Sequence, residues 1–168
     1  MLIVSPLDQA QSSYAEHAPV RVISLLSEDE DMPQFAGLDA DNHLKLYVER
    51  DMCSASISTA AKTRAAEIIQ FVSKWDKSGN ILIHCNYGVS RSMAAAFIVL
   101  CIMRGPGKET AIADEIRKLA PHADPCPLIV DYADELMGRD GEMIDAVENL
   151  PPPISTLAAP ILTLPVAA

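Results

Sequence analysis

The chain has 168 residues, a length that corresponds to about one domain. Hydrophobic residues make up 49% of it and charged residues 21%, an ordinary globular balance that excludes general disorder. The formal net charge of −10 argues against a nucleic acid or an anionic membrane as partner, because both are polyanions that would repel the chain.

The four cysteines stand at positions 53, 85, 101 and 126 without any C-x-x-C pair. This pattern indicates neither a disulfide framework nor a zinc site. No basic residue precedes the short apolar run at the N-terminus, so a secretory signal is not expected. The longest apolar stretch, residues 93–103, is too short to cross a bilayer of about 30 Å. We expect a reduced cytoplasmic protein with no metal or other cofactor.

Strand and helix patterns alternate along the first half of the chain, and helices dominate the second half. The predicted strands are residues 2–4, 20–26, 43–48 and 81–84. The predicted helices are residues 7–17, 58–77 and 92–104, followed by three amphipathic helices that end near Pro121, Gly138 and Leu150.

Two segments read as irregular. The acidic run of residues 28–31 is interpreted as a solvated loop, with an anion-repelling specificity feature as the alternative. Beyond Glu148 no charged residue occurs, and five of the twelve prolines follow Leu150. Since Pro160 and Pro165 would interrupt any long helix, we expect residues 151–168 to be an uncharged, proline-rich tail rather than a folded unit.

Residues 84–92, H-C-N-Y-G-V-S-R-S, join a predicted buried strand to a predicted apolar helix. The backbone N–H groups of such a loop converge and the helix dipole adds partial positive charge, so the loop suits a phosphate-sized oxyanion. The same field stabilises the thiolate of Cys85 at the loop's start. Arg91 can hold two oxygens of a phosphoryl group through its planar guanidinium, and Gly88 lets the loop curl.

This stretch resembles the signature H-C-x-x-G-x-x-R-[S/T] of the cysteine-dependent protein tyrosine and dual-specificity phosphatases, and it matches every fixed position. The overall length and the helical ending around residues 136–141 also look similar to those of short bacterial-type members. The resemblance implies that Cys85 is the nucleophile, that Arg91 binds the phosphoryl group and that Ser92 helps the thiolate leave in the second step. It also implies an α/β fold over residues 1–150, with a small, mostly parallel central sheet flanked by helices. The implied phosphate-binding loop is Cys85, Asn86, Tyr87, Gly88, Val89, Ser90 and Arg91.

A leaving oxygen needs a proton, and the family places an aspartate thirty-odd residues ahead of its cysteine, after the preceding strand. Asp51 fits that spacing, with Glu49 and Asp41 as the next candidates. His84 has two interpretations: it ends a strand and bonds to nearby backbone, or it supports the loop by orienting it and tuning Cys85. For Tyr87 we favour packing against the loop over a place at the pocket rim.

Cys53 lies two residues after Asp51, on a loop that must approach Cys85 during catalysis. An oxidised nucleophilic cysteine can be trapped by a nearby thiol as a reversible disulfide, which makes Cys53 a possible redox partner. The alternative, a half-packed loop cysteine, stays open.

The resemblance implies a metal-independent phosphomonoester hydrolase that forms a phosphocysteine intermediate. Its substrate would be a phosphorylated protein or a small aryl phosphate, with phosphotyrosine first and phosphoserine or phosphothreonine also admitted by a shallow cleft. The loop contains no lysine, which together with the net charge disfavours polyphosphorylated lipids. The alternatives are a non-catalytic phosphoprotein-binding module and a rhodanese-like sulfurtransferase, although rhodanese loops usually begin Cys-Arg and here Asn86 follows the cysteine.

Overall fold

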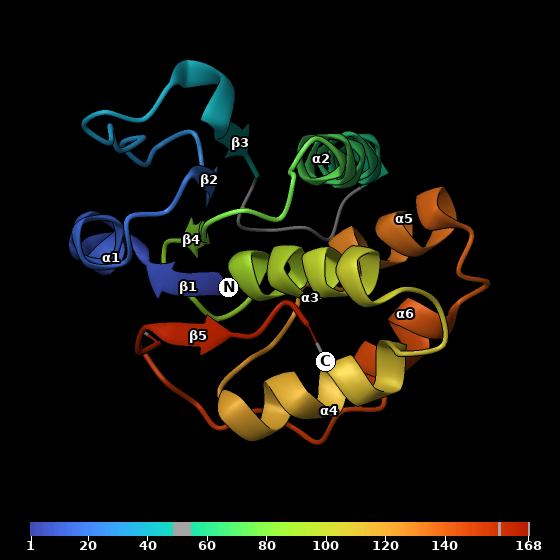
Figure 1. The fold of residues 1–168 in the computed structure, drawn as a ribbon. Helices are drawn as coiled ribbons and strands as arrows, with labels where there is room; N and C mark the ends of the chain where they lie inside the picture. The colour runs from blue at the N-terminus through green and yellow to red at the C-terminus, as the bar shows by residue number, and fades with distance from the viewer. Residues whose placement is uncertain (49–54, 158, 168) are drawn as a thin grey trace.

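The computed structural model of the chain describes residues 1–48, 55–157 and 159–167 (Figure 1). Strands and helices alternate along the first half and helices dominate the second, as the sequence predicts. The strands are β1 (Leu2–Pro6), β2 (Arg21–Leu26), β3 (His43–Tyr47), β4 (Ile81–Cys85) and β5 (Leu162–Leu164). The α-helices are α1 (Ala10–His17), α2 (Ala55–Ser73), α3 (Arg91–Arg104), α4 (Glu109–Leu119), α5 (Pro127–Met137) and α6 (Glu142–Glu148), and the 3-10 turns are η1 (Leu7–Gln9) and η2 (Ala40–Asn42).

The strands form one sheet in the order β3-β2-β4-β1-β5, in which only β5 runs antiparallel to its neighbour. The predicted small, mostly parallel sheet flanked by helices is therefore confirmed. Because parallel strands end at the same edge, the register pairs Pro6 of β1 with Cys85 of β4, and Leu26 of β2 with Tyr47 of β3. Side chains that follow these four strands consequently meet at the carboxyl edge of the sheet.

Each face of the sheet is buried against a different set of helices. Successive strand residues point to opposite faces, so Leu2 and Val4 join one hydrophobic cluster while Ile3 joins the other. Helix α1 covers the smaller cluster, and α2 and α3 cover the larger one on the opposite side (Figure 1). This double covering explains why β4 reads as a continuous apolar run rather than an alternating one.

Helix α3 runs through the middle of the molecule. It contacts the sheet on one side and α2, α4 and α5 on the others, and every residue from Arg91 to Cys101 is buried. A helix surrounded in this way needs no polar face, which accounts for its apolar sequence. Within the described residues, no helix is long and apolar enough to span a bilayer.

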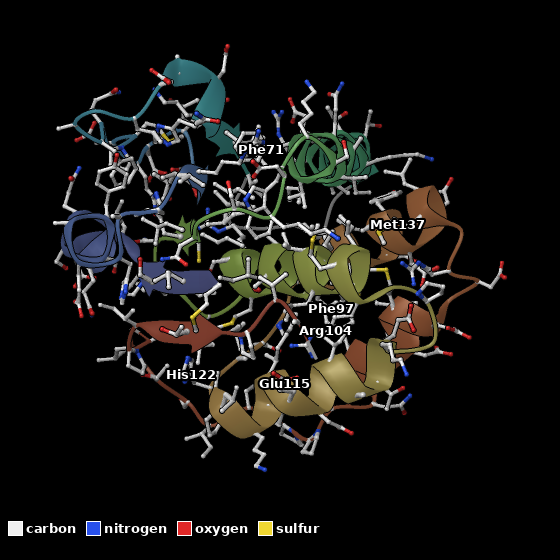
Figure 2. All side chains as sticks on the ribbon, viewed as in Figure 1. Phe71, Phe97, Arg104, Glu115, His122 and Met137 are labelled. Atoms are coloured by element: carbon white, nitrogen blue, oxygen red, sulfur yellow. The ribbon has the colours of Figure 1, made fainter. Side chains whose placement is uncertain are left out.

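The prediction that residues 151–168 lie outside the fold is wrong. β5 pairs with β1, with Leu2 opposite Leu164, and Leu164 is fully buried. The guanidinium of Arg104, which also pairs with Glu115 of α4 (Figure 2), donates a hydrogen bond to the carbonyl oxygen of Pro165 (2.7 Å). Pro160 and Pro165 flank the strand instead of breaking it, and an edge strand tolerates prolines in that position. The strand covers an edge of β1 that would otherwise expose unpaired backbone groups.

Candidate active site

The loop between β4 and α3 is held from outside by its carbonyl oxygens. The N–H of Leu7 donates to the carbonyl of Asn86 (3.0 Å), that of Ala159 to Tyr87 (2.9 Å) and that of Asp124 to Val89 (2.9 Å). Within the described chain, the backbone N–H groups of residues 87–90 donate no hydrogen bond. With the carbonyls turned outward, these donors line the inside of the loop, next to the N-terminus of α3. Donors arranged in this way suit an anion, and the phosphate-binding role of the loop stays a prediction.

Gly88 makes this curl possible. Its φ of +71° lies in the left-handed region, which residues with a Cβ atom disfavour and glycine adopts readily. A Cβ on Gly88 would also come within 3.0 Å of the backbone nitrogen of Pro6 and 3.1 Å of the Cβ of Ala159. The loop is therefore packed tightly between β1 and the chain leading into β5.

Cys85 ends β4 at the bottom of this loop, with only 2% of its surface exposed. Its Sγ lies 3.1 Å from the Oγ of Ser92, in the first turn of α3. The Ser92 hydroxyl is thus in position to donate a hydrogen bond to a thiolate. Burial raises the pKa of Cys101, further along α3, to about 12, so that thiol stays protonated and unreactive at neutral pH.

Arg91 opens α3, and its side chain is anchored from the ends of β2 and β3. Its Nη1 donates to the Oγ of Ser27 (3.1 Å) and to the carbonyl oxygen of Val48 (3.1 Å), and lies 3.6 Å from a carboxylate oxygen of Glu30. The Nε and Nη2 groups donate no hydrogen bond within the described residues. This edge supplies the two parallel donors that a phosphoryl group accepts.

Glu30 departs from the solvated loop expected for residues 28–31. Glu28, Asp29 and Asp31 are exposed, but Glu30 turns inward, where its carboxylate accepts a hydrogen bond from the N–H of Ser27 (2.6 Å). Its side chain is only 6% exposed beside Arg91. The acidic run therefore contributes one side chain that orients the guanidinium.

His84 bonds to a side chain and not to nearby backbone. The Oγ of Ser24 lies 2.6 Å from the Nε2 of His84 and 2.8 Å from the Nε2 of His43. Burial, with a smaller contribution from His43, lowers the pKa of His84 to about 3, so its ring is neutral at pH 7. A neutral, fully buried ring is no proton donor for a substrate. Its bond to Ser24 joins β4 to β2, and the role of supporting the loop and tuning Cys85 stays a prediction.

A cleft of about 390 Å³ opens above Cys85. Tyr87 stands at its rim with 53% of its surface exposed, so the expectation that it packs against the loop is wrong. Thr156 and Leu157 also line the cleft, and sequence reasoning missed both because they belong to the supposed tail. The lining residues are Cys85, Tyr87, Val89, Ser90, Arg91, Thr156 and Leu157.

The predicted acid and redox partner, Asp51 and Cys53, lie outside the described residues, as does Glu49. Asp41 is part of η2, which precedes β3, so it sits at the amino edge of the sheet, opposite Cys85. That position removes Asp41 from the candidate acids. Among the side chains the structure describes, no group of three or more His, Cys, Asp or Glu residues could hold a metal ion.

The fold is that of the cysteine-dependent dual-specificity phosphatases. Human DUSP28 matches with a TM-score of 0.58 and 20% identity, over 82% of this chain and 94% of that one. PTPMT1 in complex with PI(5)P matches with a TM-score of 0.59 and 18% identity, over 83% of this chain and 94% of that one. A human tyrosine phosphatase-like serine/threonine/tyrosine-interacting protein matches with a TM-score of 0.51 and 19% identity, over 82% of this chain and 91% of that one. No protein-family model matches the chain, and no curated protein matches its sequence.

Proposed function

We propose that this chain is a metal-independent phosphomonoester hydrolase that dephosphorylates phosphotyrosine in proteins, or small aryl phosphates, through a phosphocysteine intermediate. One observation carries the proposal: the outward-bonded carbonyls leave the N–H groups of residues 87–90 to surround an anion directly above the Cys85 thiol. Donors fixed in this way need no reorganisation as charge builds on the transferring phosphoryl group.

In the first step the Cys85 thiolate attacks phosphorus, so that an S–P bond forms and the P–O bond to the phenol breaks. The loop N–H groups and the Nε–Nη2 edge of Arg91 bind the three phosphoryl oxygens. Val48 and Ser27 fix that edge by bonding the other guanidinium nitrogen, so no rotamer freedom is lost when the substrate binds.

The leaving phenolate takes a proton from Asp51 in this proposal. Val48 accepts a hydrogen bond from Arg91, and Asp51 follows Val48 by only three positions in the sequence. This closeness in sequence to the anchor of Arg91 supports the assignment. In the second step water attacks phosphorus and gives its proton back to Asp51. The S–P bond breaks, inorganic phosphate leaves, and the Ser92 hydroxyl stabilises the returning Cys85 thiolate.

The test is turnover of an aryl phosphate in the presence of EDTA, with and without vanadate. Vanadate should inhibit and EDTA should not. Cys85→Ser should abolish turnover, whereas the matched variant Cys101→Ser should keep it, since Cys101 is buried away from the loop. Activity that survives Cys85→Ser would exclude the mechanism. Phosphotyrosine binding by the wild type without turnover would indicate a phosphoprotein-binding module. Transfer of sulfur from thiosulfate would indicate a rhodanese-like sulfurtransferase.

A further inference from the structure

The chain that leads into β5 forms a fixed wall of the cleft. The N–H of Ile154 donates to the carbonyl of Pro121 (2.9 Å), and the N–H of Ala159 donates to the carbonyl of Tyr87 (2.9 Å). Between these two anchors, Thr156 and Leu157 line the same cleft as Cys85. Backbone bonds at both ends hold the wall in place, as positioning a substrate requires.

Leu157 also lines a second cleft of about 410 Å³ on its other side, together with Leu7, Asp8, Asn86 and Tyr87. Tyr87 and Leu157 are thus common to both clefts and form the partition between them. Leu157 is 93% exposed, so it contributes almost nothing to the core of its own chain. An exposed apolar side chain at the mouth of a site gains most when a flat apolar group covers it.

A phosphorylated tyrosine supplies such a group. When its phosphate is bound in the loop above the buried Cys85, its ring must occupy the mouth of the cleft, between the loop floor and solvent. Tyr87, Val89 and Leu157 present apolar surface there. An alkyl phosphate such as phosphoserine has no ring to cover these side chains, so it loses that part of the binding free energy.

We propose that Leu157 is a substrate-positioning residue that, with Tyr87, holds the aryl ring of the substrate and gives the site its preference for aryl over alkyl phosphates. This inference rests on the proposed function and adds to it a specificity element drawn from the C-terminal segment. It assigns Leu157 no part in the chemical steps.

The experiment compares Leu157→Ala with Leu157→Met and with the control Ile154→Ala. Ile154 is an exposed apolar residue of the same segment that lines neither cleft. Leu157→Ala should raise KM for a phosphotyrosine peptide roughly 3- to 10-fold with a smaller change in kcat, since removing part of a partly covered leucine weakens binding by that order. Leu157→Met should restore KM, and Ile154→Ala should leave it unchanged.

Competitive inhibition by inorganic phosphate distinguishes an effect of Leu157 on ring binding from an effect on the loop, because phosphate occupies the loop alone. Its inhibition constant and the KM for phosphoserine should change less than twofold in Leu157→Ala, about the effect of a weak surface contact. An unchanged KM for the phosphotyrosine peptide, or an equal loss of phosphate affinity, would overturn the proposal. If the wild type binds but does not hydrolyse, the proposed function fails while the dissociation constants of the same ligands still test Leu157.

Discussion

The backbone N–H of Ala159 donates a hydrogen bond to the carbonyl oxygen of Tyr87, at 2.9 Å. This one bond joins the last segment of the chain to the middle of the loop between β4 and α3. Together with the contact between Ala159 and the position that a Cβ would take on Gly88, it makes the C-terminal segment part of the site's framework.

Removing the chain after Leu150 should therefore destabilise the fold and abolish aryl phosphatase activity. The deletion removes β5, uncovers β1 and releases the Tyr87 carbonyl.

A finer test keeps the chain whole: Leu164→Ala should lower the free energy of unfolding by about 2–5 kcal/mol, because Leu164 is fully buried. Thr163→Ala, on the exposed side of the same strand, should change it by about 0.5 kcal/mol or less. Denaturant titration measures both, and a fully active protein ending at Leu150 would contradict the assignment.

Gly88→Ala should reduce kcat/KM on the order of 100-fold, the effect expected when reacting groups are displaced by about 1 Å. The alanine would be strained at a φ of +71° and would crowd Pro6 and Ala159. Gly37→Ala is the matched control, because its φ is +81° but no atom lies within 4 Å of its added Cβ. That variant should lose some stability and keep its activity. Equal activities of the two variants would show that the loop has room for a side chain.

The sequence predicts the loop well because its chemistry is local. Strand, loop and helix follow one another without interruption, so Cys85, Gly88, Arg91 and Ser92 are brought together by adjacent elements alone. Most of the sheet follows for a similar reason, since runs of β-branched residues separated by helices favour parallel strands, although only a loop with the short turn η2 joins β2 to β3.

What the sequence does not predict comes from other parts of the chain. Ser27 and Val48 anchor Arg91 from two neighbouring strands, and no spacing pattern links them to it. β5 is only three residues long, too short for any periodicity to be detected, and the flanking prolines suggested a break. Leu157 lies in the segment that leads into this strand, so the sequence does not place it at the cleft either.

Ser92→Ala should slow the second chemical step more than the first. In the proposed mechanism the Oγ of Ser92, 3.1 Å from Cys85 Sγ, stabilises the thiolate when it is the leaving group. A hydrogen bond to a charged group is worth about 1.5–3 kcal/mol, so hydrolysis of the intermediate should slow by roughly 10- to 100-fold. Stopped-flow measurement should then show a burst of one phenol per active site. Ser13→Ala removes another buried serine, on α1, and should show neither effect; slow turnover without a burst would place the role of Ser92 in the first step.

Charge should select among phosphopeptides through Asp8. This exposed side chain lines the cleft beyond Leu157, where the residues flanking a bound phosphotyrosine would lie. A peptide with arginine beside its phosphotyrosine should be preferred over one with glutamate, and Asp8→Asn should reduce that preference by roughly two- to fivefold, as for an exposed ion pair. The preference should also shrink at 1 M salt. Relative kcat/KM values for the two peptides measure it, and a preference that Asp8→Asn leaves intact would assign the selection to other charges.

The histidine pair should make the fold less stable in acid. The Ser24 hydroxyl has a single hydrogen to donate, so it can donate to only one of the two Nε2 atoms, and the Nδ1 of His84 has no partner in the described structure. Donation from His84 Nε2 to Ser24, and from Ser24 to His43, leaves Nδ1 as a bare lone pair, which costs less than a buried N–H without an acceptor. A further proton on His84 would create such an N–H.

The sign of the effect follows from the two pKa values. Burial lowers the pKa of His84 to about 3 and that of His43 to about 4, and the positive charge of Lys45 adds to the effect on His43. In the unfolded chain both histidines have the ordinary pKa of 6.5. Unfolding therefore takes up protons between about pH 4 and 6.5, close to one per histidine, and the free energy of unfolding falls as the pH drops through that window. His84→Asn should remove about one proton from this uptake, measured by denaturant titration across the window. Ser24→Ala keeps both rings and should lower stability at every pH with the slope preserved. A slope that His84→Asn leaves unchanged would mean that His84 is protonated in the folded protein, and the hydrogen-bond assignment at Ser24 would have to be reversed.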